Sequence, residues 1–155
     1  MFNNIVMSLG PTNFKIVRGM LGGNLLDFLG YYAYDRATST DVMEDVQVPN
    51  TPALYDDPAM RTLLYYFLYD MTEHTGAVLE PTYSYLRVYK KGDVLHRHTD
   101  KKVCEYSVSI TLKREQADDI WPLCLETSDV HKVCLEEGDG LIYKGVENPH
   151  WRDKF

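Results

Sequence analysis

Cysteine is scarce in this chain, and its pattern excludes two common structural uses of the residue. Among 155 residues there are three cysteines, Cys104, Cys124 and Cys134, and no two of them form a CxxC pair. A small secreted domain held together by disulfides carries more cysteines, in even number, and a structural zinc site needs closely spaced pairs. The cysteines therefore indicate a reducing compartment, and the expected location is the cytoplasm.

Long apolar runs and an excess of basic residues are also missing. The longest apolar stretch, at residues 63–69, is far shorter than the roughly 20 residues that span a bilayer. The first residues, MFNNIVMSLGPTNF, lack the basic start and apolar core of a signal peptide, so none is expected. Acidic residues outnumber basic ones by 23 to 16, for a net charge of −7. This balance argues against a partner that is nucleic acid or an anionic membrane.

Several well-known catalytic and nucleotide-binding motifs are absent, and tyrosine is the abundant residue instead. The sequence contains no P-loop, no dinucleotide-binding GxGxxG and no GxSxG nucleophile motif. It holds 12 tyrosines, against five phenylalanines and two tryptophans. A ring with a hydroxyl tip suits half-polar cavities and interfaces, although a strand-rich composition accounts for the surplus equally well.

Two helices are expected in the first half of the chain. Residues 21–37 carry several leucines behind Asn24, a residue type that caps helix starts. A second helix is expected between Asp57, another cap residue, and Gly76, because apolar side chains recur between them at helical spacing. Residues 38–56, which contain two prolines and several acids, are expected to form a loop.

From Val78 onward the hydrophobic period changes from 3.6 to two, which predicts short strands. In residues 103–112, for example, apolar side chains alternate with Ser107 and Ser109, as in a strand with one buried face. Helices followed by short strands indicate an α+β fold with an antiparallel sandwich or barrel. We expect one domain over residues 1–155, with a helical part at about 1–77 and a barrel at about 78–155. The strands are expected at residues 82–90, 103–112, 120–126, 130–136 and 140–144.

The segment LRVYKKGDVLHRHTD, residues 86–100, contains the candidate metal-binding residues. On an extended chain His96, His98 and Asp100 point the same way. His98 and Asp100 form the HxD half of a 2-His-1-carboxylate triad, which suits non-haem Fe(II) because it leaves coordination positions open. The second histidine must come from another strand, and His150 in ENPHWRD is the candidate. Since HxD alone is a short and unspecific motif, an ordinary surface or core histidine remains the alternative.

Four segments together resemble the 2-oxoglutarate and Fe(II)-dependent oxygenases, above all the prolyl-hydroxylase-like group and small bacterial and phage members. They occur in the family's order and occupy the second half of the chain. The resemblance implies a double-stranded β-helix, a jelly-roll or cupin-like barrel with N-terminal helices packed on one side. The segments are TYSYLRVYKKGDVLHRHTD (82–100), CEYSVSITL (104–112), WPLCLE (121–126) and EEGDGLIYKGVENPHWRD (136–153).

The resemblance also implies roles for individual residues. His98, Asp100 and His150 would be the catalytic Fe(II) ligands. Tyr89 stands where prolyl-hydroxylase-like enzymes place a tyrosine whose hydroxyl meets the distal carboxylate of 2-oxoglutarate, with a barrel-lining aromatic as the alternative reading. The implied activity is that of a dioxygenase that uses Fe(II), 2-oxoglutarate and O2 to hydroxylate an unactivated C–H bond, with release of succinate and CO2.

The carboxylate of 2-oxoglutarate also needs a cation, best supplied by arginine. The family commonly places an arginine or lysine several residues beyond the distal histidine, but this chain stops at Phe155. Arg152 is the expected substitute, because it shares a strand face with His150, and Arg87 is the second option. The same shortness leads us to expect either a trimmed barrel or a native chain that is longer.

Other readings remain open at this stage. One is a non-catalytic metal-binding jelly-roll or cupin-like module that senses a ligand or mediates an interaction; another is a cupin-like enzyme that does not use 2-oxoglutarate.

His96 is expected to face solvent or to support the ligands, whereas His74 and His131 are expected to be structural. The substrate is expected to be a peptide side chain or a small molecule, and the sequence leaves its identity and the oligomeric state open.

Overall fold

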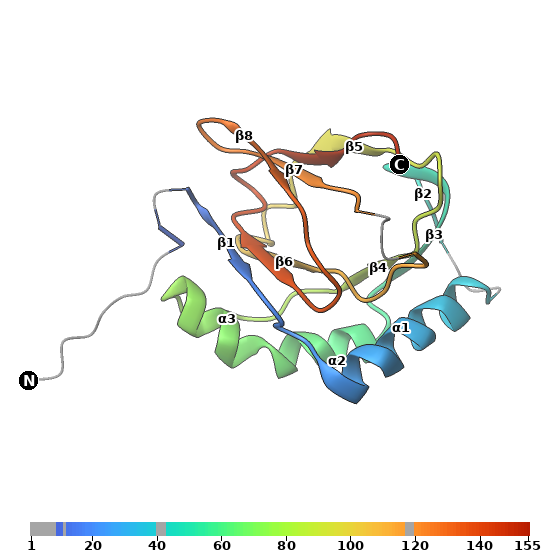
Figure 1. Ribbon diagram of the computed structural model, residues 1–155. Helices are drawn as coiled ribbons and strands as arrows, with labels where there is room; N and C mark the ends of the chain where they lie inside the picture. Colours follow the sequence, from blue (N-terminus) through green and yellow to red (C-terminus); the bar gives the residue numbers. More distant parts are fainter. Residues whose placement is uncertain (1–8, 11, 40–42, 117–119) are drawn as a thin grey trace, which may run out of the picture.

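The computed structural model describes residues 9–10, 12–39, 43–116 and 120–155 (Figure 1). The helices are α1 (Gly23–Ala37), α2 (Pro58–Tyr66) and α3 (Leu68–Thr75). The strands are β1 (Phe14–Val17), β2 (Met43–Asp45), β3 (Val48–Tyr55), β4 (Tyr85–Arg87), β5 (Leu95–His98), β6 (Ser107–Ile110), β7 (Leu123–Glu126), β8 (Val130–Val133), β9 (Gly140–Tyr143) and β10 (His150–Arg152).

The helices lie together on one side of the molecule, and the strands occupy the other side (Figure 1). The strands form three antiparallel sheets, with the orders β1-β9-β6, β5-β10-β7-β8 and β2-β3-β4. This mixed architecture agrees with the predicted α+β class and with helices packed on one side. None of the described helices has the length and apolarity needed to cross a bilayer.

The helix starts and ends follow local chemistry, with two departures from prediction. Asp57 caps α2 as expected, since its carboxylate accepts from the N–H groups of Ala59 and Met60 at 3.0 and 3.3 Å. Helix α1, by contrast, begins behind Gly22 without a side-chain cap, so the assignment of that role to Asn24 is wrong. The predicted second helix is interrupted at Phe67, which is only 2% exposed and anchors the junction of α2 and α3 in the core.

The segment predicted as a loop, residues 38–56, contains β2 and β3. Together with β1, three strands lie within the part expected to be helical. Pairing overrides the turn-like composition, because β3 joins β4 through the pairs Ala53–Arg87 and Leu54–Leu86. The prolines are tolerated because the register between β2 and β3 shifts over this stretch, where Asn50 has a φ of 62°.

Alternation along β9 divides the core in two. Ile142 faces the helices and packs in a cluster with Leu29, Phe67 and Leu86. Leu141 and Tyr143 face the opposite way, into a second cluster to which strands of all three sheets contribute. The side chains on this second face surround the candidate site, so the helices support the site from behind rather than forming it.

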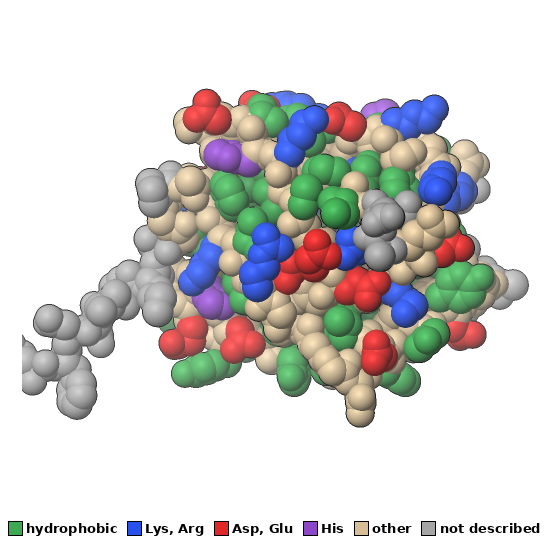
Figure 2. Space-filling view, viewed as in Figure 1, with side chains coloured by type: hydrophobic (Ala, Val, Ile, Leu, Met, Phe, Trp, Pro, Cys, Tyr) green, Lys and Arg blue, Asp and Glu red, His purple; other side chains and the backbone are tan. Residues whose placement is uncertain are grey.

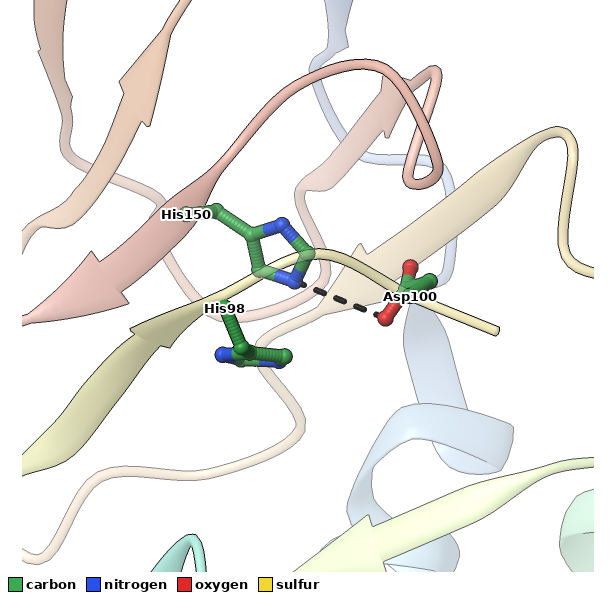
Figure 3. A group of neighbouring side chains, drawn as sticks. All are labelled: His98, Asp100 and His150. Atoms are coloured by element: carbon green, nitrogen blue, oxygen red, sulfur yellow. Dashed lines mark ion pairs between the residues drawn. The ribbon is translucent and has the colours of Figure 1, made fainter. Parts of the chain in front are cut away.

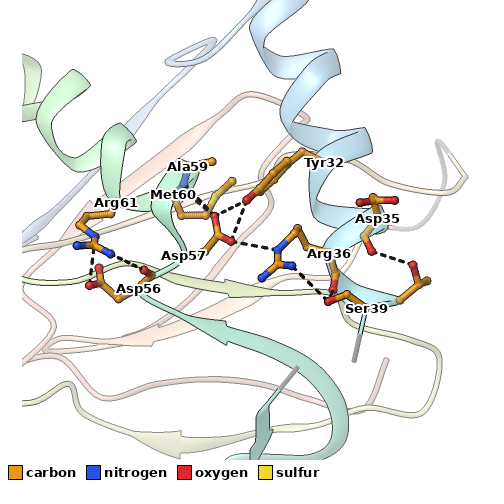
Figure 4. Close-up of polar contacts among 10 residues, drawn as sticks. Tyr32, Asp35, Arg36, Ser39, Asp56, Asp57, Ala59, Met60 and Arg61 are labelled. Atoms are coloured by element: carbon orange, nitrogen blue, oxygen red, sulfur yellow. Dashed lines mark hydrogen bonds and ion pairs between the residues drawn. The ribbon is translucent and has the colours of Figure 1, made fainter. Parts of the chain in front are cut away.

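A buried carboxylate fixes α1 to α2. The side chain of Asp57, with none of its surface exposed, accepts from the Tyr32 hydroxyl at 2.9 Å and from Nε of Arg36 at 3.3 Å, in addition to capping α2 (Figure 4). Both partners lie on α1. The Asp57 side chain therefore accepts hydrogen bonds from the first N–H groups of α2 and also holds α1 against α2.

Candidate metal centre

Strands β5 and β10 bring two histidines face to face. His98 ends β5 and His150 begins β10, and the two are paired in the antiparallel ladder. Their ring centroids lie 4.3 Å apart. Residues 52 positions apart in the sequence (150 − 98) thus become direct neighbours through strand pairing alone.

An irregularity in this ladder explains why His96 does not join them. The register shifts between the pairs His150–His98 and Arg152–Leu95, so three steps on β5 match two on β10. Such a bulge breaks the alternation of side chains. His96 and Arg97 are both exposed, whereas Leu95 is buried. The expectation that His96 points with His98 and Asp100 is therefore wrong, and its alternative placement toward solvent is correct.

Backbone carbonyls determine which ring nitrogen of each histidine is available to a metal ion. Nδ1 of His98 lies 2.8 Å from the carbonyl oxygen of His96, and Nδ1 of His150 lies 3.0 Å from that of Asn148. A carbonyl only accepts hydrogen bonds, so each Nδ1 carries a proton, and Nε2 is the nitrogen that each ring can offer to a metal ion. Burial lowers the pKa of His150, against the opposing effects of the Asn148 carbonyl and the Asp100 charge, and this keeps its ring neutral.

Asp100 completes the cluster just beyond the end of β5. Its Oδ1 lies 3.6 Å from Nε2 of His150, as Figure 3 shows, and its Oδ2 accepts from the Ser107 hydroxyl at 2.6 Å. The Asp100 N–H donates to the carbonyl of Gly145 at 2.9 Å. The side chain is 20% exposed, so one side of the carboxylate remains open to incoming molecules.

His98, Asp100 and His150 each offer one ligand atom, and these atoms all lie within 4.8 Å of one another. Two imidazole nitrogens and one carboxylate oxygen form a donor set suited to a divalent transition metal such as Fe(II). The three side chains converge from β5, the segment directly after it and β10 (Figure 3). The residues present therefore fit a metal ion held on one face by three protein ligands.

A buried tyrosine closes the inner side of the cluster. The Tyr143 hydroxyl lies 3.4 Å from Nε2 of His150 and 3.4 Å from the hydroxyl of Ser109. Burial raises the pKa of Tyr143, and the neighbouring Asp100 charge acts in the same direction. The phenol therefore stays protonated and neutral.

An arginine lies on the same face as His150, among aromatic rings. The Arg152 guanidinium lies 5.9 Å from the ring centroid of Tyr89 and 4.9 Å from that of Trp121, and it donates to the Trp121 carbonyl. Burial lowers its pKa. No ion pair joins Arg152 to a carboxylate within the described ranges, so its charge is available to an anion.

Arg87, the second option for the same task, already has an anionic partner. It forms an ion pair with Asp45, and its side chain is 7% exposed. It also donates to the Tyr89 hydroxyl at 3.4 Å. Arg87 therefore fixes the hairpin of β2 and β3 and orients Tyr89, whereas Arg152 has no ion pair with any described residue.

Near Asp100, two tyrosines and a lysine form a rim. The ring centroids of Tyr55 and Tyr83 lie 4.9 Å apart, and the Lys101 ammonium lies 5.5 and 5.3 Å from them. Burial raises the pKa of Tyr83, with smaller effects of Cys104 and Asp100. The rim puts aromatic surface and a positive charge near Asp100.

The other histidines have structural contacts, as predicted. Nδ1 of His74 lies 3.0 Å from the Lys15 ammonium, and Nε2 of His131 lies 3.0 Å from the Thr127 hydroxyl. Sequence reasoning missed Ser107 and Gly145, which contact Asp100. The serines that alternate with apolar residues in 103–112 could have indicated Ser107 as a contact of the site. The polar residues of an alternating strand are, however, usually interpreted as its solvent-facing side.

Comparisons with known proteins support the fold. No protein-family model matches the chain, and no curated protein matches it in sequence. A Pseudomonas putida prolyl-4-hydroxylase has a similar structure, with a TM-score of 0.72 and 17% identity, covering 94% of this chain and 87% of that one. OsALKBH1 matches with a TM-score of 0.57 and 13% identity, covering 92% and 85%.

Both neighbours are 2-oxoglutarate and Fe(II) oxygenases, so the resemblance inferred from the sequence is confirmed at the level of the fold. Their similarity is consistent with a jelly-roll arrangement of the sheets. The expectation that disfavoured nucleic acid as a partner gains no support, because one of the two neighbours is an ALKBH protein.

Proposed function

We propose that this protein is a 2-oxoglutarate-dependent Fe(II) oxygenase that hydroxylates a C–H bond of a peptide side chain or a small molecule. The observation that carries the proposal is the convergence of His98, Asp100 and His150 with both Nε2 lone pairs directed away from backbone partners. A facial set of three protein ligands leaves half of an octahedral metal ion open.

His98, Asp100 and His150 would hold the metal, and bound Fe(II) with 2-oxoglutarate would supply the oxidation of a C–H bond by O2, with succinate and CO2 as products. The chain's own contribution is geometric. The carbonyls of His96 and Asn148 fix the orientation of the two rings, and ligands with fixed orientation bind a metal more tightly. Tyr143 and the surrounding core exclude water from the inner side.

Arg152 and Tyr89 would bind the distal carboxylate of 2-oxoglutarate. The half-buried guanidinium of Arg152 has no carboxylate partner among the described residues, and a planar guanidinium can bind a carboxylate through two hydrogen bonds. The Tyr89 hydroxyl, held by Arg87, adds a polar group beside it. Arg152 is two residues from His150 on β10, so cosubstrate and metal would be bound on one strand face.

The test is an anaerobic titration of the apoprotein with Fe(II) and 2-oxoglutarate. A visible metal-to-ligand charge-transfer band is expected in the wild type, and it should be lost in His98→Ala and Asp100→Ala. Admission of O2 should then release succinate in an iron-dependent manner. A band of equal strength in either variant would contradict the metal assignment.

The same titration separates the alternative of a non-catalytic metal-binding module. Such a module would bind Fe(II) through the same three residues but would give neither the charge-transfer band nor succinate. The half-buried Arg152, which forms no ion pair within the described residues, favours the enzyme, because its charge is then free to bind a cosubstrate carboxylate.

A further inference from the structure

The two oxygens of Asp100 have different surroundings. Oδ1 faces Nε2 of His150 at 3.6 Å, whereas Oδ2 accepts a hydrogen bond of 2.6 Å from the Ser107 hydroxyl. Hydrogen bonds to a charged acceptor are stronger than neutral ones and favour one orientation of the carboxylate. Oδ1 is therefore the oxygen presented to the metal-binding space, and Oδ2 is held away from it.

The backbone at Gly145 holds the carboxylate from the other side. A Cβ at this position would lie 2.0 Å from Oδ2 of Asp100 and 2.5 Å from Oγ of Ser107, so a side chain has no room there. The Gly145 carbonyl also accepts the Asp100 N–H at 2.9 Å. Asp100 is thus enclosed by a hydroxyl and by a backbone segment that only glycine allows to come so close.

We propose that Ser107 is a positioning residue that makes Asp100 a ligand through one oxygen only. A carboxylate with both oxygens free can grip a metal with both and so occupy an extra coordination place. In a site that must admit a cosubstrate and O2, this place has to stay open. The inference rests on the proposed metal site and adds a role for Ser107 that the ligand set itself does not contain.

Ser109 offers a matched control on the same strand. It lies two residues along β6 and points to the same face, but its hydroxyl lies 3.4 Å from that of Tyr143. No hydrogen bond joins Ser109 to Asp100 in the described part of the chain. Replacement of either serine by alanine removes the same atom from the same face, and only one of the two replacements frees Oδ2.

The experiment uses Mn(II), which is stable in air, as the probe of the full-length apoprotein. Its dissociation constant and the water-proton relaxation per bound ion are measured for the wild type, Ser107→Ala, Ser107→Thr, Ser109→Ala and His98→Ala. Relaxation counts the waters left on the metal, which a merely structural role would not change. Thermal unfolding of each apoprotein checks that the variants are folded.

Ser107→Ala is expected to weaken Mn(II) binding about 10-fold or more, the usual effect of removing a group that orients a ligand. Relaxation per bound ion should fall by about one third, because Oδ2 replaces one of the three waters that a facial triad leaves. Ser107→Thr, which keeps the hydroxyl, and Ser109→Ala should both match the wild type.

Equal affinity and equal relaxation in Ser107→Ala and Ser109→Ala would overturn the role of Ser107 while leaving the metal site intact. Failure of the Ser107→Thr variant to restore the wild-type relaxation would also overturn it, provided that this variant is folded. If His98→Ala binds Mn(II) as tightly as the wild type, the proposed metal centre itself is wrong, and the inference falls with it.

Discussion

Arg152 holds a positive charge between aromatic rings, with the Trp121 carbonyl as its hydrogen-bond acceptor. If it binds the cosubstrate, Arg152→Gln should raise the KM for 2-oxoglutarate about 10- to 100-fold, since a hydrogen bond to a charged group is worth about 1.5–3 kcal/mol. Arg152→Lys should give an intermediate value, because a lysine keeps the charge but not the two-pronged geometry. Steady-state succinate formation measures both values.

Arg97→Gln is the control for this residue-scale prediction. Arg97 lies on β5 next to the site, but its side chain is 53% exposed and forms an ion pair with Glu126. Its loss should leave the KM for 2-oxoglutarate within about twofold of the wild type, as expected for an exposed ion pair. A raised KM in Arg87→Gln with a normal value in Arg152→Gln would transfer the role to Arg87.

At the scale of elements, Asp57 is expected to determine how α1 and α2 pack. Asp57→Ala removes the cap of α2 and leaves Tyr32 and Arg36 without their buried acceptor (Figure 4). Loss of a cap costs about 1 kcal/mol, and the unsatisfied partners add a similar amount each, so about 2–4 kcal/mol of unfolding free energy should be lost. Urea unfolding measures the change.

The exposed Asp35 on α1 provides the comparison. Asp35→Ala should change the unfolding free energy by less than about 0.5 kcal/mol, as is usual for surface positions. Asp57→Asn should lie between the two, because the amide oxygen still caps the helix without the charge. Equal stability of Asp57→Ala and Asp35→Ala would show that the network does not hold the helices together.

The elements also show what a sequence can and cannot reveal. Capping chemistry is local, so Asp57 and Gly76 marked helix ends correctly. The strands β2 and β3 were missed because β3 is held by pairing with β4, a partner remote in sequence, and β2 in turn pairs with β3. The bulge that turns His96 outward depends likewise on β10. Local signals therefore predict elements, whereas strand partners determine register and exposure.

The sequence likewise predicted some residues of the candidate site and missed others. His98, Asp100 and His150 were predicted from their spacing and the family resemblance, and strand pairing brings them together. Ser107 was interpreted as part of an alternating polar face. Ser107 points toward Asp100, between the sheets, because the apolar residues of β6 face the helices. The alternation of one strand does not reveal whether its polar face meets solvent or another sheet.

At the scale of the whole molecule, tyrosine is distributed between the site and the surface. Tyr83 and Tyr89 line the candidate site, whereas several others are exposed on the helices. Figure 2 shows hydrophobic side chains both along the side where the helices lie and over the strands. The exposed tyrosines of the helices are Tyr31, Tyr34, Tyr65, Tyr66 and Tyr69. The surplus therefore has two locations, and the site accounts for only part of it.

Distant parts of the chain are joined across the whole molecule. Strand β1, near the start, pairs with β9, and this pairing supports the proposal that residues 1–155 form a single domain. Asp139 reinforces the junction. Its carboxylate accepts from the N–H of Gly19, 2.9 Å away and 120 residues earlier, from Arg18 and from the N–H of Glu136 at 2.9 Å.

The stability of the whole molecule should therefore fall in acid through Asp139. Burial raises the pKa of Asp139, but hydrogen bonds from Gly19, Arg18 and Glu136 outweigh it, and the net pKa is lowered. The stabilisation that ionised Asp139 gives to the folded state is complete above the unfolded-state pKa of about 3.9. It is lost as pH falls through the lower pKa of the folded state. Asp139→Asn should flatten the fall of unfolding free energy below about pH 4, measured by urea unfolding at several pH values. The exposed Asp27→Asn should keep the wild-type slope, and an unchanged slope in Asp139→Asn would refute the assignment.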